Sequence, residues 1–286
     1  MAVEADKDKA PVMLGKHLRL RPCRHGPMLY SLNDEFIGRS YEAYGEMNEN
    51  EVRLQCSLVA PGDVVLDIGA NIGVNVIPLA KRVGAQGKII AFEPQRIVHQ
   101  MLCANLALNG LTNVVAHWAA VGAQAGTICV PPIDYNALGN FGGIALRDKQ
   151  GEAVPIVTVD QLALDRCRLI KIDVEGMELE VLQGAGQTID RLRPLLYFEN
   201  NLEEKSPPLV ANLLARGYRL YWHLLPLFNS QNFRGEPTEL WPNIESVNVL
   251  GLPPGNAAKT MWFHEITSPN DWWKQLPPDQ GIPPPQ

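Results

Sequence analysis

Short apolar runs alternate with helical periodicity along the middle of the chain. The clearest run covers 64–68 and leads into a glycine-containing turn, and a second covers 89–92. Continuous apolar runs of this length are typical of strands covered on both faces of a parallel sheet. Further strands are predicted over 113–121, 168–173 and 194–200, and an antiparallel pair over 218–223 and 246–250. This order predicts an α/β fold with a doubly wound, mostly parallel, seven-stranded sheet and helices on both faces.

The turn after the first strand indicates a ligand. Gly69 and Gly73 let backbone N–H groups approach a bound molecule, and the next helix adds unpaired donors. A dinucleotide fingerprint requires glycine where this chain has Asn71, so close contact with a pyrophosphate is not provided for. Asp67 precedes the turn, and Glu93 ends the second strand about where an acid binds ribose hydroxyls. The pattern indicates a nucleoside without pyrophosphate.

Polar residues also end two later strands. Asp173 closes the 168–173 run and is followed by Glu175, and the 194–200 run ends in Glu199 and Asn200. Ligands bind at the carboxyl ends of strands in open α/β sheets, so we expect these side chains to line a site. Lys171 lies only two residues before Asp173 in the same strand, and we expect the carboxylate to find its partner elsewhere.

Composition narrows the class of protein. The chain has 286 residues, 46% of them hydrophobic and 20% charged, which is enough for one sizeable core. A formal net charge of −6 argues against a broad nucleic-acid-binding surface. The five cysteines are odd in number and widely spaced, which indicates neither a disulfide framework nor a zinc site. With no signal-peptide pattern and no apolar run of ~20 residues, we expect a cytoplasmic protein without a membrane span.

The chain divides into three parts by composition. Residues 1–45 are predicted to be an N-terminal extension with a small hairpin, and 46–252 to form the ligand-binding domain. Residues 253–286 are a proline-rich tail with little expected regular structure, although tryptophans such as Trp272 can dock it.

At these motifs the chain resembles the FkbM-type family of class I S-adenosylmethionine-dependent methyltransferases. The resemblance covers roughly 46–252, and its most specific element is Ile172-Asp-Val-Glu-Gly-Met-Glu178. It implies a Rossmann-like sheet, S-adenosylmethionine as cofactor, and usually methylation of a hydroxyl on a sugar, glycolipid or secondary metabolite. The residues that would hold the cofactor are Asp67, Gly69, Ala70, Asn71, Gly73, Glu93, Pro94, Ala119 and Asp173.

Methyl transfer to an alcohol requires positioning of the reactants and a base that takes the hydroxyl proton. The candidate bases are Asp173, Glu175, Glu199 and His223. Glu175 can equally serve as a cap for helix-terminal donors, and a single histidine at a strand end is more often a satisfied structural group.

Amide and aromatic side chains suit the hydroxyls and ring faces of a small-molecule or glycan acceptor. On this basis Asn200, Asn229, Asn232 and Tyr41 are candidate acceptor-binding residues. Asp173, Glu199 and Asn200 could also ligate Mg²⁺ through oxygen atoms, but a metal is not predicted.

Two other functions stay open from the sequence. A protein that binds S-adenosylmethionine without transferring its methyl group would keep the same Asp67 and Glu93. An NAD-dependent oxidoreductase is disfavoured by Asn71. The sequence does not determine the oligomeric state.

Overall fold

The computed structural model describes residues 10–146, 150–242, 244–256 and 263–276. Its largest element is an eight-stranded sheet with the order β14-β12-β13-β11-β10-β4-β5-β6. The parallel strands are β4 (Val64–Ile68), β5 (Lys88–Phe92), β6 (Val114–His117), β10 (Leu169–Ile172) and β11 (Leu195–Glu199). The antiparallel strands are β12 (Arg219–Pro226), β13 (Glu245–Leu252) and β14 (His264–Ile266). The predicted doubly wound α/β fold is confirmed.

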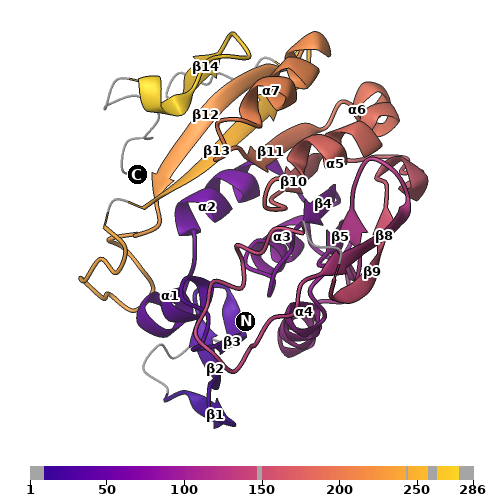
Figure 1. The fold of residues 1–286 in the computed structure, drawn as a ribbon. Coiled ribbons are helices and arrows are strands. Elements are labelled where there is room, and N and C mark those ends of the chain that lie inside the picture. The colour runs from indigo at the N-terminus through magenta and orange to yellow at the C-terminus, as the bar shows by residue number, and fades with distance from the viewer. Residues whose placement is uncertain (1–9, 147–149, 243, 257–262, 277–286) are drawn as a thin grey trace.

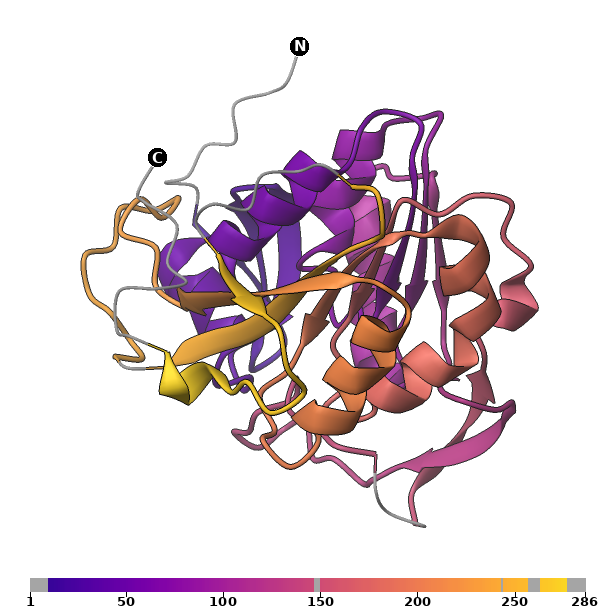
Figure 2. The ribbon, with the colours of Figure 1, turned by 90° about the horizontal axis from the view of Figure 1, so that it is seen from above.

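Helices cover both faces of this sheet (Figures 1 and 2). On one face lie α1 (Ile37–Tyr44), α2 (Glu49–Leu58), α3 (Val76–Val83) and α4 (Arg96–Leu108). On the other lie α5 (Glu178–Gly184), α6 (Gly186–Leu192) and α7 (Ser206–Ala215). Side chains alternate along each strand, so Leu66 and Leu196 join the core beneath α5–α7, and Val65 and Leu195 join the core on the α1–α4 side.

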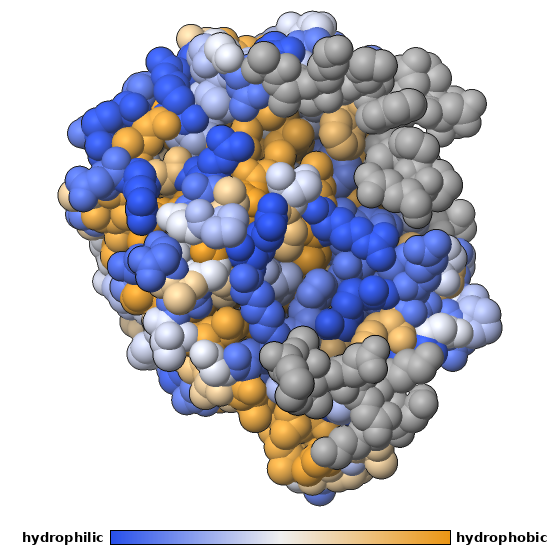
Figure 3. Space-filling view, turned by 180° about the vertical axis from the view of Figure 1, so that it is seen from behind, coloured by the Kyte–Doolittle hydropathy of each residue, from blue (hydrophilic) through white to orange (hydrophobic). Residues whose placement is uncertain are grey.

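An N-terminal sheet packs on the α1–α4 side. It consists of β1 (Val12–Leu14), β2 (Leu18–Cys23) and β3 (Gly26–Ser31), joined antiparallel. Asn105 of α4 attaches β3 to the domain, because its side chain accepts from the Leu29 N–H at 2.7 Å and donates to the Leu29 carbonyl at 3.0 Å. Val12, Met13 and Leu14 are exposed, and orange apolar surface is visible at this lower end of the molecule in Figure 3.

The strand predicted over 113–121 is wrong as a single element. The chain leaves the main sheet after β6, and β7 (Ala120–Val121) pairs with β9 (Glu152–Val157) in a separate three-stranded sheet that includes β8 (Gly126–Val130). Trp118 stands at the break, where its indole N–H donates to the Pro94 carbonyl at 2.8 Å. After the break, Ala120 pairs with Ile156 of β9 and no longer continues the main sheet.

The eighth strand comes from the segment expected to lack regular structure. β14 pairs with β12, and a 3₁₀ turn over Trp273–Gln275 follows it; a second such turn, Asp160–Leu162, precedes β10. Trp272 packs edge-on against Trp222 with 5.7 Å between ring centroids and is buried, so burial of an aromatic ring fixes the segment. Among the described residues, no helix combines the length and apolar character that crossing a membrane requires.

Candidate functional site

The glycine turn is built around close backbone contact between two strands. Gly69 has φ +82°, and a Cβ at this position would lie 1.7 Å from the Asp173 carbonyl oxygen. Only glycine satisfies both conditions, because other residues disfavour positive φ and carry the Cβ that would overlap the oxygen. Gly73 and Asn71 also have positive φ, +100° and +48°. The turn after β4 is therefore locked against the end of β10.

Glu93 holds this turn from the neighbouring strand. Its carboxylate accepts hydrogen bonds from the backbone N–H of Asn71 at 2.9 Å and of Gln95 at 2.8 Å. The side chain is 3% exposed, and burial raises the pKa of its carboxyl group to about 7, although the two N–H donors lower it. Each carboxylate oxygen keeps acceptor capacity for a further donor, as ribose hydroxyls would provide.

Lys171 joins the turn to the acidic strand end, contrary to the expectation from sequence. Its ammonium nitrogen lies 3.3 Å from an oxygen of Asp67 and 3.3 Å from an oxygen of Asp173, and it donates to the Gly69 carbonyl at 2.8 Å. Burial lowers the pKa of Lys171, but the charges of Asp67 and Asp173 outweigh burial and raise it above its usual value. Lys171 and Asp173 are two positions apart in the strand. They still form an ion pair, because the long lysine side chain extends along the strand to the Asp173 carboxylate.

Asp67 lies beneath the turn. Its side chain is fully buried, its carboxylate oxygens have no hydrogen-bond partner, and Lys171 is its ion-pair partner. Burial raises the pKa of Asp67, and Lys171 opposes that effect. Lys171 stands within an apolar strand, and a lysine that is buried in a strand requires a nearby acid. Its position was therefore the sequence signal for an ion pair with Asp67.

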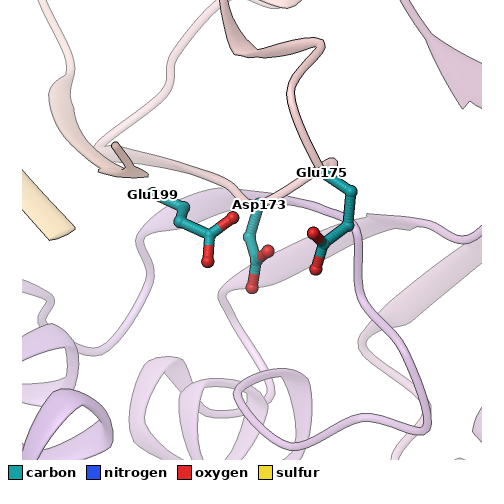
Figure 4. Close-up of side chains that lie close together, drawn as sticks. All are labelled: Asp173, Glu175 and Glu199. Atoms are coloured by element: carbon teal, nitrogen blue, oxygen red, sulfur yellow. The ribbon is translucent and has the colours of Figure 1, made fainter. Parts of the chain in front are cut away.

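The predicted acids Asp173, Glu175 and Glu199 come together at the carboxyl ends of β10 and β11 (Figure 4). One carboxylate oxygen from each lies within 4.8 Å of the others. This group, called the acidic cluster below, can hold protons or a divalent cation. Asp173 and Glu199 were two of the three residues in the sequence hypothesis for a metal, and Glu175 is the third acid of this cluster.

Two members of the acidic cluster resist ionisation. Burial raises the pKa of Glu175 to about 8, and the charges of Asp173 and Glu178 add to the effect. Burial and the same neighbouring acids raise the pKa of Glu199 well above its usual value, and one Glu199 oxygen is buried without a hydrogen-bond partner. Glu175 has φ +53°, a backbone conformation that costs energy for any residue except glycine.

Glu178 fixes the strained segment. Its carboxylate accepts from the backbone N–H of Val174 at 3.2 Å and of Gly176 at 3.0 Å. Glu178 therefore holds the backbone ahead of α5, which has no side-chain cap at Met177, and the Glu175 carboxylate lies in the acidic cluster instead of capping the helix.

A cleft connects the glycine turn with the acidic cluster. The space between its walls measures about 460 Å³, with the open solvent at its mouth included. It is lined by Ile68, Gly69, Phe92, Glu93, Pro94, Gln95, Ala119, Ala120, Val121, Gly142, Ile144, Leu146, Asp173, Val174, Glu175 and Met177.

Gln95 and the loop around 142–146 were missed by the sequence analysis. Gln95 donates to the Phe141 carbonyl at 2.7 Å and accepts from the Tyr135 hydroxyl at 3.1 Å, so it ties this loop beside the cleft. The sequence signal that could have identified Gln95 was its position directly after Glu93-Pro94.

Four of the predicted cofactor residues do not line the cleft: Asp67, Ala70, Asn71 and Gly73. Ala70 is buried, and its backbone N–H donates to the Phe92 carbonyl at 2.9 Å.

His223 occupies the same edge of the sheet but is buried. It is 1% exposed, its Nδ1 lies 2.9 Å from the Tyr197 hydroxyl, and its ring packs edge-on against Phe263. Burial lowers the pKa of His223 to about 4, so its imidazole is neutral at pH 7.

The four candidate acceptor-binding residues make internal contacts. Tyr41 is buried and stacks on Tyr30, with 5.7 Å between ring centroids. The Asn200 amide donates to the Ser206 hydroxyl at 2.9 Å at the start of α7. Neither residue lines the cleft.

The loop after β12 is fastened to the N-terminal half of the chain. Asn229 donates to the Glu46 carboxylate at 2.7 Å, and Glu46 also accepts from the Phe233 N–H at 2.7 Å and from Arg24 at 2.5 Å. Asn232 closes the loop through its bond to the Glu236 carbonyl. Both asparagines thus stabilise the loop.

Comparison with known proteins identifies a family whose model matches this chain. The family model "Methyltransferase FkbM domain" matches residues 67–220. Methyltransferase sdnD of Sordaria araneosa is 34% identical over 43% of this chain and 60% of its own length. Methyltransferase 1 of Beauveria bassiana is 26% identical over 46% of this chain and 62% of its own length. The chain therefore spans about three fifths of the curated relatives that it matches.

Among solved structures, methyltransferase FkbM from Methylobacillus flagellatus KT is 17% identical with a TM-score of 0.45, covering 76% of this chain and 55% of that chain.

Proposed function

The chain belongs to the FkbM methyltransferase family, and we propose that it transfers the methyl group of S-adenosylmethionine to a hydroxyl of a saccharide, glycolipid or small secondary metabolite. The observation that carries this proposal is the cleft between Glu93 and the acidic cluster. At one end of the cleft, Glu93 can bind the hydroxyls of a nucleoside. At the other end, the acidic cluster can accept a proton.

The residues of the cleft fit S-adenosylmethionine. Glu93 offers carboxylate oxygens for ribose hydroxyls, the small Ala119 and Ala120 leave room for a flat base, and the Gly69 turn lets the backbone approach. Asp173 provides negative charge for the amino end of the cofactor. When bound, the cofactor supplies an electrophilic methyl group.

The chain's own residues have two tasks in such a transfer. The walls of the cleft hold the acceptor oxygen in line with the methyl group, which can contribute ~7–11 kcal/mol. Glu175 takes the proton of the acceptor hydroxyl, because it lines the cleft and its raised pKa of about 8 makes it a base matched to neutral or slightly alkaline pH. Glu199 lies beside Glu175 and Asp173, and burial together with the neighbouring acids raises the pKa of its carboxyl group well above the usual value.

Two measurements test the proposal. Isothermal titration calorimetry with S-adenosylmethionine and S-adenosylhomocysteine measures binding, and Glu93→Ala is expected to abolish it. Incubation of glycan and metabolite extracts with isotopically labelled S-adenosylmethionine identifies the labelled acceptor. No binding by the intact protein would refute the proposal. Binding without label in any hydroxylated acceptor would favour a protein that binds the cofactor without catalysis.

A further inference from the structure

The loop that carries Glu175 runs from the end of β10 to the start of α5. Glu175 and Gly176 follow each other in it with φ +53° and +91°, so two successive residues lie in the left-handed region. This conformation costs energy at Glu175 and persists only where the surroundings hold it. At its first end the loop is held by β4, because the Asp173 N–H donates to the Ile68 carbonyl at 3.0 Å. The restraint at its far end decides where the Glu175 carboxylate lies.

Lys205 holds the far end of this loop. Its ammonium group donates a hydrogen bond to the Gly176 carbonyl. Lys205 lies in the connection from β11 to α7, 29 residues further along the chain, so the bond joins two separate loops. Glu178 holds only N–H groups of its own loop, because an ionised carboxylate accepts hydrogen bonds and cannot donate to a carbonyl. Lys205 therefore supplies a contact that Glu178 cannot make.

The connection from β11 to α7 fixes the position of Lys205. The backbone N–H of Lys205 donates to the Leu202 carbonyl at 3.0 Å, and the N–H of Ser206 donates to the same carbonyl at 3.1 Å. The Ser206 side chain is buried and accepts from the Asn200 amide at 2.9 Å. Asn200 directly follows Glu199. The connection that begins at one acid of the acidic cluster thus fastens the loop that carries another.

Lys205 acts on Glu175 through the backbone. Burial raises the pKa of Glu175, the charges of Asp173 and Glu178 raise it further, and the charge of Lys171 lowers it. Lys205 is not among these charges, although its ammonium group lies at the same loop. The contact of its ammonium group with a peptide carbonyl therefore restrains the conformation of the loop, and that conformation places Glu175 among the groups that set its pKa.

We propose that Lys205 is a positioning residue for Glu175: by binding the Gly176 carbonyl, it holds the left-handed loop that presents the Glu175 carboxylate to the cleft. The catalytic meaning of this assignment rests on the proposed function, in which Glu175 takes the proton of the acceptor hydroxyl. The restraint of the loop does not, because the surroundings of Glu175 can be measured without an acceptor. Without the bond, the loop is free to leave positive φ and to carry Glu175 into water.

The titration of the Glu175 carboxyl group measures its surroundings directly. It is followed by ¹³C NMR of protein with labelled glutamate, and the Glu175 signal is assigned by its loss in Glu175→Gln. In the intact protein the pKa of Glu175 is expected at about 8, because burial and the neighbouring acids raise it. In Lys205→Met it should fall by about one pH unit or more, since the relaxed loop exposes the carboxyl group and moves it away from Asp173 and Glu199.

Two control variants separate the hydrogen bond from the loss of charge. Lys205→Arg keeps N–H donors at the end of a long side chain and should titrate as the wild type does. Glu204→Gln removes a charge from the exposed neighbouring position and should also leave the midpoint unchanged. An unchanged midpoint in Lys205→Met, or a fall in either control, would overturn the proposal. If Lys205→Met does not fold, Lys205→Gln takes its place under the same criteria, because its shorter side chain ends before the carbonyl.

Kinetics with the identified acceptor test the catalytic part. Lys205→Met should lower kcat about 10-fold and leave both KM for the acceptor and the affinity for S-adenosylhomocysteine unchanged, because a displaced base slows the transfer without removing a wall of the cleft. An unchanged kcat would refute the positioning role. Calorimetric titration of the intact protein with S-adenosylhomocysteine keeps the two ideas apart. Absence of binding refutes the proposed methyltransferase function and leaves the NMR result standing, and an unshifted midpoint refutes only the role of Lys205.

Discussion

We expect Lys171 to be essential for the stability of the protein, because it neutralises the Asp67 carboxylate, which has no other partner. Lys171→Met removes the charge and fills most of the same volume with an unbranched apolar side chain. At 3.3 Å, each ion pair of Lys171 corresponds to about 5 kcal/mol of attraction at an effective dielectric constant of ~20. The Asp173 pair is worth less than this, because the Asp173 side chain is 43% exposed and water screens it. Fully buried Asp67 carries most of the effect.

In the variant, Asp67 must take up a proton to remain buried. Protonating a carboxyl with an unfolded pKa of ~3.9 at pH 7 costs about 1.4 kcal/mol per unit over ~3 units, or about 4 kcal/mol. This agrees with the ~3–5 kcal/mol found when one partner of a buried ion pair is removed. Since the folded variant then binds one proton more than the unfolded chain, its stability falls as pH rises. The deficit should grow by about 3 kcal/mol from pH 5 to pH 7.

Urea unfolding followed by circular dichroism measures the deficit at both pH values, provided that the m-value is unchanged. The matched control is the double variant Asp67→Asn, Lys171→Met, which removes the buried charge together with its partner. It should recover at least about 2 kcal/mol relative to Lys171→Met alone. A deficit under about 1 kcal/mol, a deficit independent of pH, or no recovery in the double variant would refute the reasoning.

Three further predictions concern the cleft. Gly69→Ala should destabilise the protein by well over the ~1–2 kcal/mol expected for Gly110→Ala, because both glycines have positive φ but only at Gly69 would the Cβ overlap the Asp173 carbonyl; equal urea midpoints would contradict this. Glu93→Gln should weaken the binding of S-adenosylhomocysteine, measured by calorimetry, about 10–100-fold. In the intact protein, the affinity for S-adenosylhomocysteine should rise through pH 7 as Glu93 ionises. An affinity that does not depend on pH would argue against a contact with the Glu93 carboxylate. Glu175→Gln should slow methyl transfer to the identified acceptor about 10²–10⁴-fold, and the wild-type rate should rise with pH up to about 8, since the base must be deprotonated; an unchanged rate in the variant would exclude Glu175 as the base.

The structure differs from the sequence expectations for two physical reasons. One is how far a side chain extends, and the other is contact between segments that are distant in the sequence. Lys171 pairs with Asp173 although they are two positions apart in the strand, because the long lysine side chain can cover that distance. Tyr41 and Asn200 have the residue types of an acceptor site but make core and helix-start contacts. Such choices depend on what lies across the sheet, and spacing along the chain does not reveal it.

The sequence by itself determined the doubly wound sheet, the glycine turn and the acids at the strand ends. These features follow from local rules: apolar runs bury strands, glycine permits positive φ, and parallel strands bring their carboxyl ends to one edge. Only the tertiary structure decided the protonation of the site, because burial and neighbouring charge set the pKa of Glu175 and Glu199. It alone brought Asn229, in the loop after β12, to Glu46 in the N-terminal part of the chain, because a contact between segments so far apart in the sequence depends on how they pack.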